Sequence, residues 1–162
     1  MDLESAIRSL HREKVEAVLI GGAAMALQGS SLITSEMGFC YERSKDNAER
    51  LAQAVAPHHP RLRDASAGRP FRFDAQTIER GSNFKLATDL GDIDFLAEVL
   101  GLGSYDAVQR ASVTMNINGI DCQVLSVAGL IKAKKAAGRP RDLYAIPELE
   151  ALEELRKKTG LD

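Results

Sequence analysis

The spacing of apolar residues near the start of the chain predicts alternating helices and strands. Apolar side chains recur at helical spacing within residues 3–13, which predicts an amphipathic helix. Residues 15–20 form a short apolar run that stops at a pair of glycines, as is typical of a buried strand. The small side chains of residues 23–27 then favour a short helix that ends at Gly29.

The pattern continues through the middle of the chain. Residues 33–41 are predicted to form a second strand. Ser44 follows as a helix cap, and the apolar spacing behind it predicts a helix that ends at Pro57. A basic, loop-like stretch that includes Arg63 comes next, and residues 71–73 are predicted to form a short strand.

Strands dominate the next part of the chain, and helices end it. The predicted elements are strands over 83–88 and 93–99, a helix over 104–111, strands over 113–117 and 120–125, a helix over 127–137 and a last helix from Pro147. A turn at residues 89–92 joins the first two strands, and Asn118–Gly119 is the strongest short hairpin signal in the sequence.

The order of these elements predicts a mixed α/β (α+β) domain with a central sheet. A length of 162 residues suits one compact domain, so we expect residues 1–162 to form a single unit. Hydrophobic residues make up 44% and charged residues 27%, which argues against disordered, collagen-like and membrane proteins.

Charge and cysteine content narrow the function classes. The net charge of -2 and an aromatic content of 5% without tryptophan argue against general nucleic-acid coating and base-stacking surfaces. Only Cys40 and Cys122 are present, without CxxC spacing, and the N-terminus does not resemble a secretory signal. We therefore expect a reduced, cytoplasmic protein with no membrane partner.

The predicted strand over residues 33–41 separates apolar from polar side chains. Ile33, Met37 and Phe39 fall on one face, which favours burial of that face. Thr34 and Glu36 point from the opposite face, toward whatever occupies it.

Two aspartates fall together on a later strand. Asp92 and Asp94 share one face, and Ile93 and Phe95 share the other. A carboxylate buried without a partner costs several kcal/mol, so these groups need a cation, a hydrogen-bond donor or water. Asp92 is open to interpretation as a turn residue, whereas Asp94 lies deeper in the strand and is the stronger site candidate.

The glycine pair at Gly21–Gly22 allows two interpretations. It makes a tight turn between strand and helix, and it also lets the backbone approach an anion at the start of the helix.

The helix over 127–137 carries a lysine on its apolar stripe. Lys134 follows Leu130 on that stripe, so it either reaches the edge of the core or aims its ammonium group into a cleft. The densest basic cluster in the sequence consists of Lys132, Lys134, Lys135, Arg139 and Arg141. This cluster is either a solvated helix end or a contact surface for phosphate or RNA. Asp142 either orients Lys134 or caps the segment that follows.

Taken together, four segments resemble the minimal nucleotidyltransferase family of the DNA polymerase beta-like superfamily. They are IGGAAMALQGSSLITSEMGF, LGDIDFL, LIKAKKAAGRPRDL and IPELEALEEL, in the family's order and spacing. The family includes the abortive-infection type nucleotidyltransferase toxins. The resemblance implies a polymerase beta-like fold, with a mixed central sheet flanked by helices. It also implies transfer of a nucleoside monophosphate from a nucleoside triphosphate to a hydroxyl acceptor such as RNA, and an antitoxin-like protein partner.

The resemblance also assigns residues to roles. The positions that match nucleotide binding are Gly21, Gly22, Ser30, Thr34, Lys134 and Asp142. The positions that match catalysis are Glu36, Asp94 and Lys134, and those that match metal ligands are Glu36 and Asp94. Asp92 is a further metal-ligand candidate because it shares the face of Asp94, although it lies in the wrong strand to replace residue 38. In the family, two Mg²⁺ ions clamp the attacking and leaving oxygens of an in-line displacement, which explains why carboxylates must project from one face.

The sequence departs from the family at the strand motif. The family's Thr-x-Asp-x-Asp is Thr34-Ser35-Glu36-Met37-Gly38 here, so Gly38 replaces a metal-binding carboxylate. Impaired transfer is the expectation, whether through natural decay, a rearranged site or a deliberate change. The alternatives are a non-catalytic nucleotide- or RNA-binding or interaction domain on the same fold, and an unrelated α/β scaffold with structural aspartates.

Overall fold

A computed structural model describes residues 1–64 and 70–160 of the chain. The strands are β1 (Ala17–Ile20), β2 (Glu36–Tyr41), β3 (Arg61–Leu62), β4 (Phe84–Thr88), β5 (Gly91–Leu96), β6 (Glu98–Val99), β7 (Gly103–Ser104), β8 (Ser112–Ile117) and β9 (Ile120–Leu125). The helices are α1 (Leu3–Arg12), α2 (Gly21–Leu27), α3 (Lys45–Val55), the 3-10 turn η1 (Ala56–His58), α4 (Ala75–Arg80), α5 (Tyr105–Arg110), α6 (Val127–Ala137) and α7 (Pro140–Thr159).

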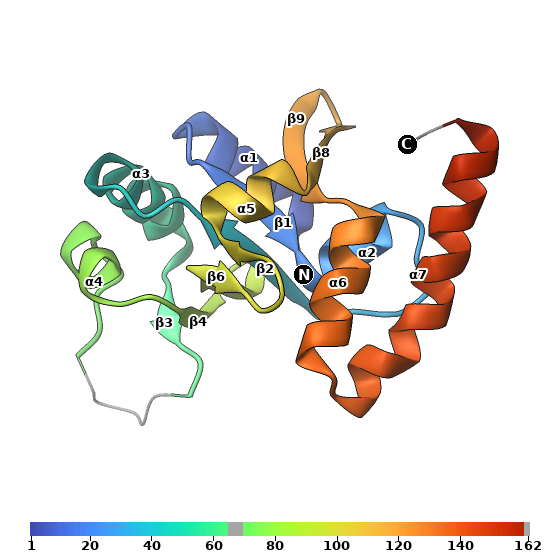
Figure 1. Ribbon diagram of the computed structural model, residues 1–162. Helices are drawn as coiled ribbons and strands as arrows, with labels where there is room; N and C mark the ends of the chain where they lie inside the picture. The colour runs from blue at the N-terminus through green and yellow to red at the C-terminus, as the bar shows by residue number, and fades with distance from the viewer. Residues whose placement is uncertain (65–69, 161–162) are drawn as a thin grey trace.

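Seven of these strands form one mixed sheet in the order β3-β4-β5-β2-β1-β9-β8 (Figure 1). Strand β2 runs parallel to β5, and β1 runs parallel to β9, whereas the other neighbours are antiparallel. Strands β6 and β7 pair separately. This architecture confirms the predicted mixed α/β fold with a central sheet flanked by helices.

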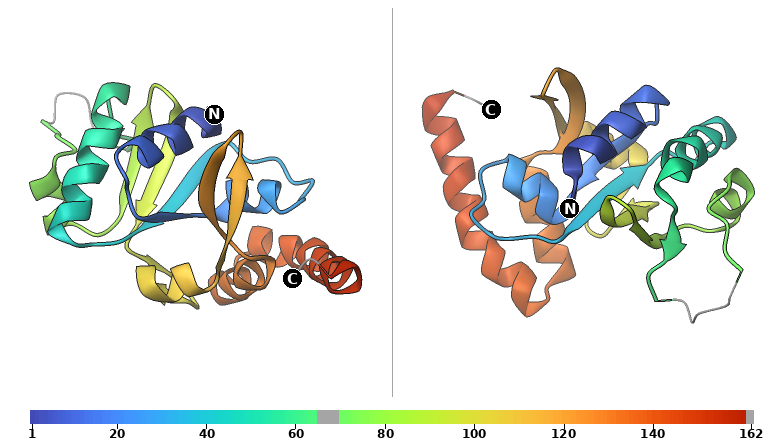
Figure 2. Two further views of the ribbon diagram at one scale, coloured as in Figure 1. Left: turned by 90° about the horizontal axis from the view of Figure 1, so that it is seen from above. Right: turned by 180° about the vertical axis from the view of Figure 1, so that it is seen from behind.

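Helices cover both faces of the sheet (Figure 2). Helices α1 and α3 lie on one face, and α5, α6 and α7 lie on the other. Under α1 and α3, the rings of Phe39 and Phe95 stack with centroids 5.8 Å apart. Phe73 packs against Phe84 and Phe95 at 5.3 and 5.8 Å. Residues 71–73 therefore anchor the core as irregular chain, and the strand predicted for them is wrong.

Strand β2 begins later than predicted. Residues 33–35 are not part of the strand, and Ile33 is fully exposed, so its predicted burial is wrong. The pairing of β2 with both neighbours reaches only from Glu36 to Tyr41, which leaves the preceding residues without a sheet to join. Met37 and Phe39 are buried as predicted.

The C-terminal elements follow their local capping signals. Asn118 and Gly119 take positive φ values of 50° and 90°, which the predicted β8–β9 hairpin turn requires. The last helix begins at Pro140, and the prediction that it starts at Pro147 is wrong. Proline at the first helical position loses no hydrogen bond, and α7 then continues through Pro147 to Thr159.

Candidate functional site

The strand positions that the sequence predicts to carry carboxylates lie side by side across the parallel pair β2 and β5. The register places Glu36 beside Asp92 and Gly38 beside Asp94. Residues paired in this way share one face of the sheet. The opposite face of β5 carries Ile93 and is buried. Asp92 lies within β5, so its interpretation as a turn residue is wrong.

An arginine from the sheet edge pairs with both aspartates of β5. Arg63 Nη2 donates to Asp94 Oδ1 at 2.7 Å, and its Nε lies 4.0 Å from Asp92 Oδ2. The side chains of Arg63 and Asp94 are only 18% and 19% exposed, so water screens this ion pair weakly. From the sequence, Arg63 is one of the charges of a predicted loop. Its position depends on β3 joining β4, and a two-residue strand leaves no pattern in the sequence.

The described side chains do not by themselves form the expected two-metal site, which stays a prediction. Among the side chains that the structure describes, which do not include that of Glu36, no group of three or more metal-ligating residues lies together. Gly38 offers no ligand, and Asp94 is already paired with a cation. The side chain of Glu36 lies outside the described part of the structure. Mg²⁺ requires near-ideal octahedral geometry, which a missing ligand at position 38 and a paired Asp94 disfavour.

The glycine pair lies at the junction of β1 and α2. Gly21 takes a φ of +65°, a left-handed conformation that favours glycine. A Cβ atom on Gly22 would lie 2.4 Å from Oγ1 of Thr34. The second glycine is therefore required for the close approach of the chain just before β2, which brings two of the predicted nucleotide-binding positions together.

Ser30, another predicted nucleotide-binding residue, contacts α7. Its hydroxyl donates to the carboxylate of Glu148. Ser31 donates its amide and hydroxyl to the same group, at 3.2 and 2.5 Å. Hydrogen bonds from both serines, with that of Ser30 contributing most, hold the pKa of Glu148 below its usual value. The role of Ser30 in nucleotide binding stays a prediction.

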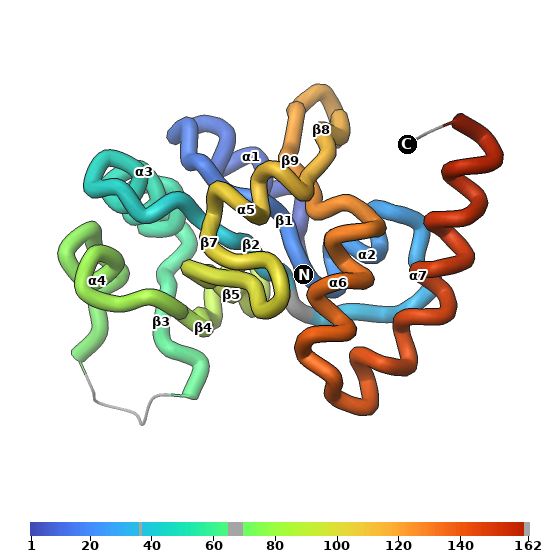
Figure 3. The backbone as a smooth tube through the Cα atoms, in the orientation of Figure 1, coloured from blue at the N-terminus to red at the C-terminus, as the bar shows by residue number. Residues whose placement is uncertain are grey.

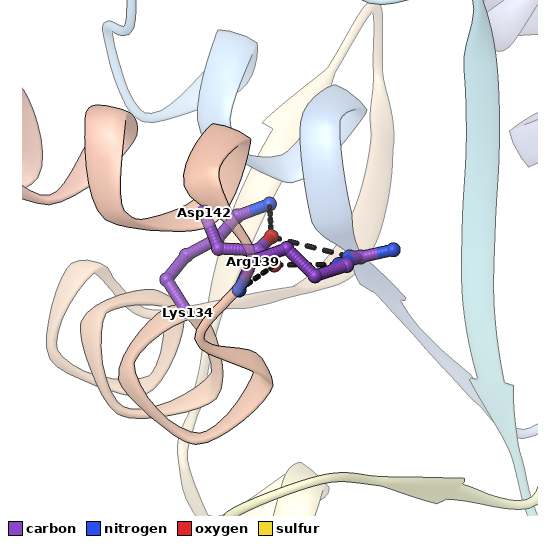
Figure 4. A network of polar contacts seen from close by, with 3 residues as sticks. All are labelled: Lys134, Arg139 and Asp142. Atoms are coloured by element: carbon purple, nitrogen blue, oxygen red, sulfur yellow. Dashed lines mark hydrogen bonds and ion pairs between the residues drawn. The ribbon is translucent and has the colours of Figure 1, made fainter.

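A second ionic cluster joins α6 to the start of α7 (Figure 4). Asp142 accepts hydrogen bonds from Lys134 Nζ at 3.2 Å and from Arg139 Nε at 2.6 Å. It also accepts one from the backbone amide of Arg139 at 3.1 Å. Both interpretations of Asp142 thus hold, because it contacts Lys134 and also caps α7.

This buried carboxylate is strongly acidic. The side chain of Asp142 is 1% exposed, and hydrogen bonds from Arg139 and then Lys134 lower its pKa to about 2. A buried carboxylate with these partners stays ionised at neutral pH. The side chain of Lys134 is 20% exposed, and its ammonium group is held by Asp142 at 3.2 Å.

No helix in the described part of the chain is long and apolar enough to cross a membrane. No family model matches the sequence. No curated protein matches it either. The structure is similar to the crystal structure of a putative nucleotidyltransferase from Thermotoga maritima, with a TM-score of 0.54 and 15% sequence identity. The similarity covers 99% of this chain and 91% of that one. The chain therefore has a nucleotidyltransferase-like fold.

Proposed function

We propose that this chain is a nucleotidyltransferase-type protein that binds a nucleoside triphosphate and whose transfer step is impaired. The observation that carries the proposal is the pairing of Arg63 with Asp94 at 2.7 Å, beside Gly38 in the sheet. Two carboxylates project from the same face of β5, as the family's chemistry requires. The neighbouring position, Gly38, has no side-chain ligand. The charge of Asp94 is neutralised by the guanidinium group of Arg63.

The triphosphate would bind between the β1–α2 junction and the α6–α7 cluster. Gly21 and Gly22 give the backbone a close approach there, and Lys134 supplies a positive charge of fixed position. Because Asp142 holds the Lys134 ammonium group, little side-chain entropy is lost when a phosphate binds. We propose an RNA hydroxyl as the acceptor and an antitoxin-like protein as the partner, both on the resemblance of the four sequence segments.

A non-catalytic nucleotide- or RNA-binding domain is the second candidate function. The same pairing of Arg63 favours it, because a site without its metal ligands can keep its binding surface. The two functions differ in turnover and not in affinity. Residual transfer to RNA supports an impaired enzyme, and binding with no transfer supports the binding domain.

The test combines binding and transfer measurements. We expect calorimetry to detect a non-hydrolysable triphosphate, and labelled triphosphates with total RNA and MgCl₂ to show weak transfer or none. We expect the double variant Gly38→Asp with Arg63→Ala to increase transfer. A Cβ at position 38 would lie 3.2 Å from Cγ1 of Ile20, so the Ile20 side chain has to shift by a few tenths of an ångström to admit it.

The control variant is Thr114→Asp, which adds the same charge on exposed strand β8. Absence of triphosphate binding would overturn the proposal, and so would efficient transfer by the unaltered chain.

A further inference from the structure

We propose that the guanidinium group of Arg63 takes the place of the divalent cation. It reduces the negative charge of Asp92 and Asp94, so that the chain folds and the site binds its ligand without metal. The inference deepens the proposed function and takes from it only the identity of the ligand. The role of Arg63 in place of the cation rests on its contacts with Asp92 and Asp94.

Strand pairing fixes the position of Arg63. The preceding residues of β3 pair with β4 in the register Arg61 with Ala87 and Leu62 with Leu86. The Arg63 backbone amide then donates to the carbonyl of Lys85 at 3.0 Å, and its Nη1 donates to the carbonyl of Leu86 at 3.2 Å. The Arg63 side chain is therefore fixed at both ends, at its backbone amide and at its guanidinium group. It is a fixed part of the carboxylate site and not a surface charge that moves freely.

The carboxylates of β5 need such a charge. Asp92 and Asp94 lie two residues apart on one face of β5. Like charges at this spacing repel, and the repulsion grows as exposure to water falls. Arg63 pairs with Asp94 at 2.7 Å and lies 4.0 Å from Asp92 through a different nitrogen, Nε. One guanidinium thus spans both carboxylates, as a bridging metal ion would.

The guanidinium group also excludes the ion that it replaces. An arginine side chain stays protonated at any pH at which the protein folds. A divalent cation that approached Asp94 would meet this positive charge at close range and would lose one carboxylate oxygen to it. The site is therefore expected to discriminate against Mg²⁺ and Mn²⁺, and triphosphate binding is expected to persist in EDTA.

Mn²⁺ is the probe for this proposal, because bound and free Mn²⁺ differ in their electron paramagnetic resonance spectra. We expect no saturable Mn²⁺ binding by the unaltered chain and no change of its Tm with MnCl₂. Two neutral variants, Arg63→Gln and Arg63→Ala, should lower Tm by about 2–6 °C in the absence of metal. MnCl₂ should bind to them and recover part of that loss.

Arg61→Gln is the matched control. Arg61 lies in β3, two residues before Arg63, is exposed, and donates to the carbonyl of His59 at 3.3 Å. We expect this variant to keep the Tm and the lack of Mn²⁺ binding of the unaltered chain.

Three results of the Mn²⁺ and Tm measurements would overturn the proposal. They are saturable Mn²⁺ binding by the unaltered chain, unchanged Tm and no Mn²⁺ binding in both Arg63 variants, and unfolding of both variants that MnCl₂ does not reverse. A chain that binds no triphosphate in EDTA or in MgCl₂ contradicts the proposed function alone. A chain that binds triphosphate only with MgCl₂ contradicts the Arg63 proposal alone.

Discussion

Asp142 is a charged residue that the fold has buried almost completely. Its carboxylate receives three kinds of donor, namely the Arg139 side chain, the Arg139 backbone and the Lys134 ammonium group. A buried carboxylate in such a network strongly destabilises the fold when its partners or its charge are removed. The cluster therefore holds the proposed phosphate-binding lysine in place and also joins α6 to α7.

The pKa of Asp142 makes this contribution dependent on pH. The pKa is lowered from 3.8 to about 2, so the stabilisation is complete above pH 4 and is lost as the pH falls through about 2. A pKa lowered by this amount corresponds to about 2 kcal/mol. We expect Asp142→Asn to lower the free energy of unfolding by about 2–4 kcal/mol at pH 7.

Urea unfolding at pH 7 and pH 2.5 measures this difference, which should shrink at the lower pH. The exposed Glu49→Gln is the control and should change the unfolding free energy by less than about 0.5 kcal/mol. An equal loss for Asp142→Asn at both pH values would contradict the ionic origin of the effect.

At the scale of elements, α7 holds the segment that connects α2 to β2. This connection, residues 28–35, runs beside α7 in the chain trace (Figure 3). The Glu148 carboxylate accepts hydrogen bonds from the hydroxyl groups of Ser30 and Ser31. Arg156 Nη2 donates to the carbonyl of Gln28 at 3.1 Å. The last helix thus determines the path of the loop that carries two predicted nucleotide-binding residues, Ser30 and Thr34.

Removal of the Glu148 carboxylate should release this loop. In Glu148→Ala we expect the amide of Ser31, which donates to Glu148 at 3.2 Å, to exchange hydrogen several-fold faster. Hydrogen exchange followed by mass spectrometry measures this, and Glu154→Ala on exposed α7 surface is the control. Because the pKa of Glu148 is lowered, its hydrogen bonds with Ser30 and Ser31 should persist at pH 4.5 and weaken only at lower pH. Unchanged exchange in Glu148→Ala would show that the loop holds its path without α7.

At the scale of the whole molecule, the fold buries the thiol of Cys40. Cys40 lies on β2, near the middle of the sheet order, and is fully buried. Burial raises its pKa to about 12, so the reactive thiolate is scarce at ordinary pH. Helices on both faces exclude reagents as well. The thiol should therefore become reactive only when the domain opens.

This gives a test of cooperative folding. In a Cys122→Ser variant, labelling of Cys40 with a thiol reagent at pH 8 should require global unfolding. Its rate should rise with urea with the same dependence as the unfolding transition followed by circular dichroism. Rapid labelling in the absence of urea would mean that α2 and α5 cover this strand only transiently.

The alternation and capping patterns determined much of this fold from sequence. The first helix, the β8–β9 hairpin and the helix over 127–137 form where apolar spacing and turn residues place them. Such signals act over a few neighbouring residues, so the sequence carries them directly. Errors arose where distant pairing decides, as at Ile33, which no neighbouring strand reaches, and at residues 71–73, which pack by their rings.

The candidate site likewise has some features that the sequence predicts and others that depend on the tertiary structure. The sequence alone determined that Asp92 and Asp94 share a face, that Gly38 has no carboxylate and that a lysine follows the apolar stripe of α6. Only the tertiary structure brought Arg63 onto the aspartates and Glu148 onto Ser30, across 31 and 118 residues of chain. Charge pairing at such separations depends on strand order and helix docking, because neither partner leaves a periodic signal near the other.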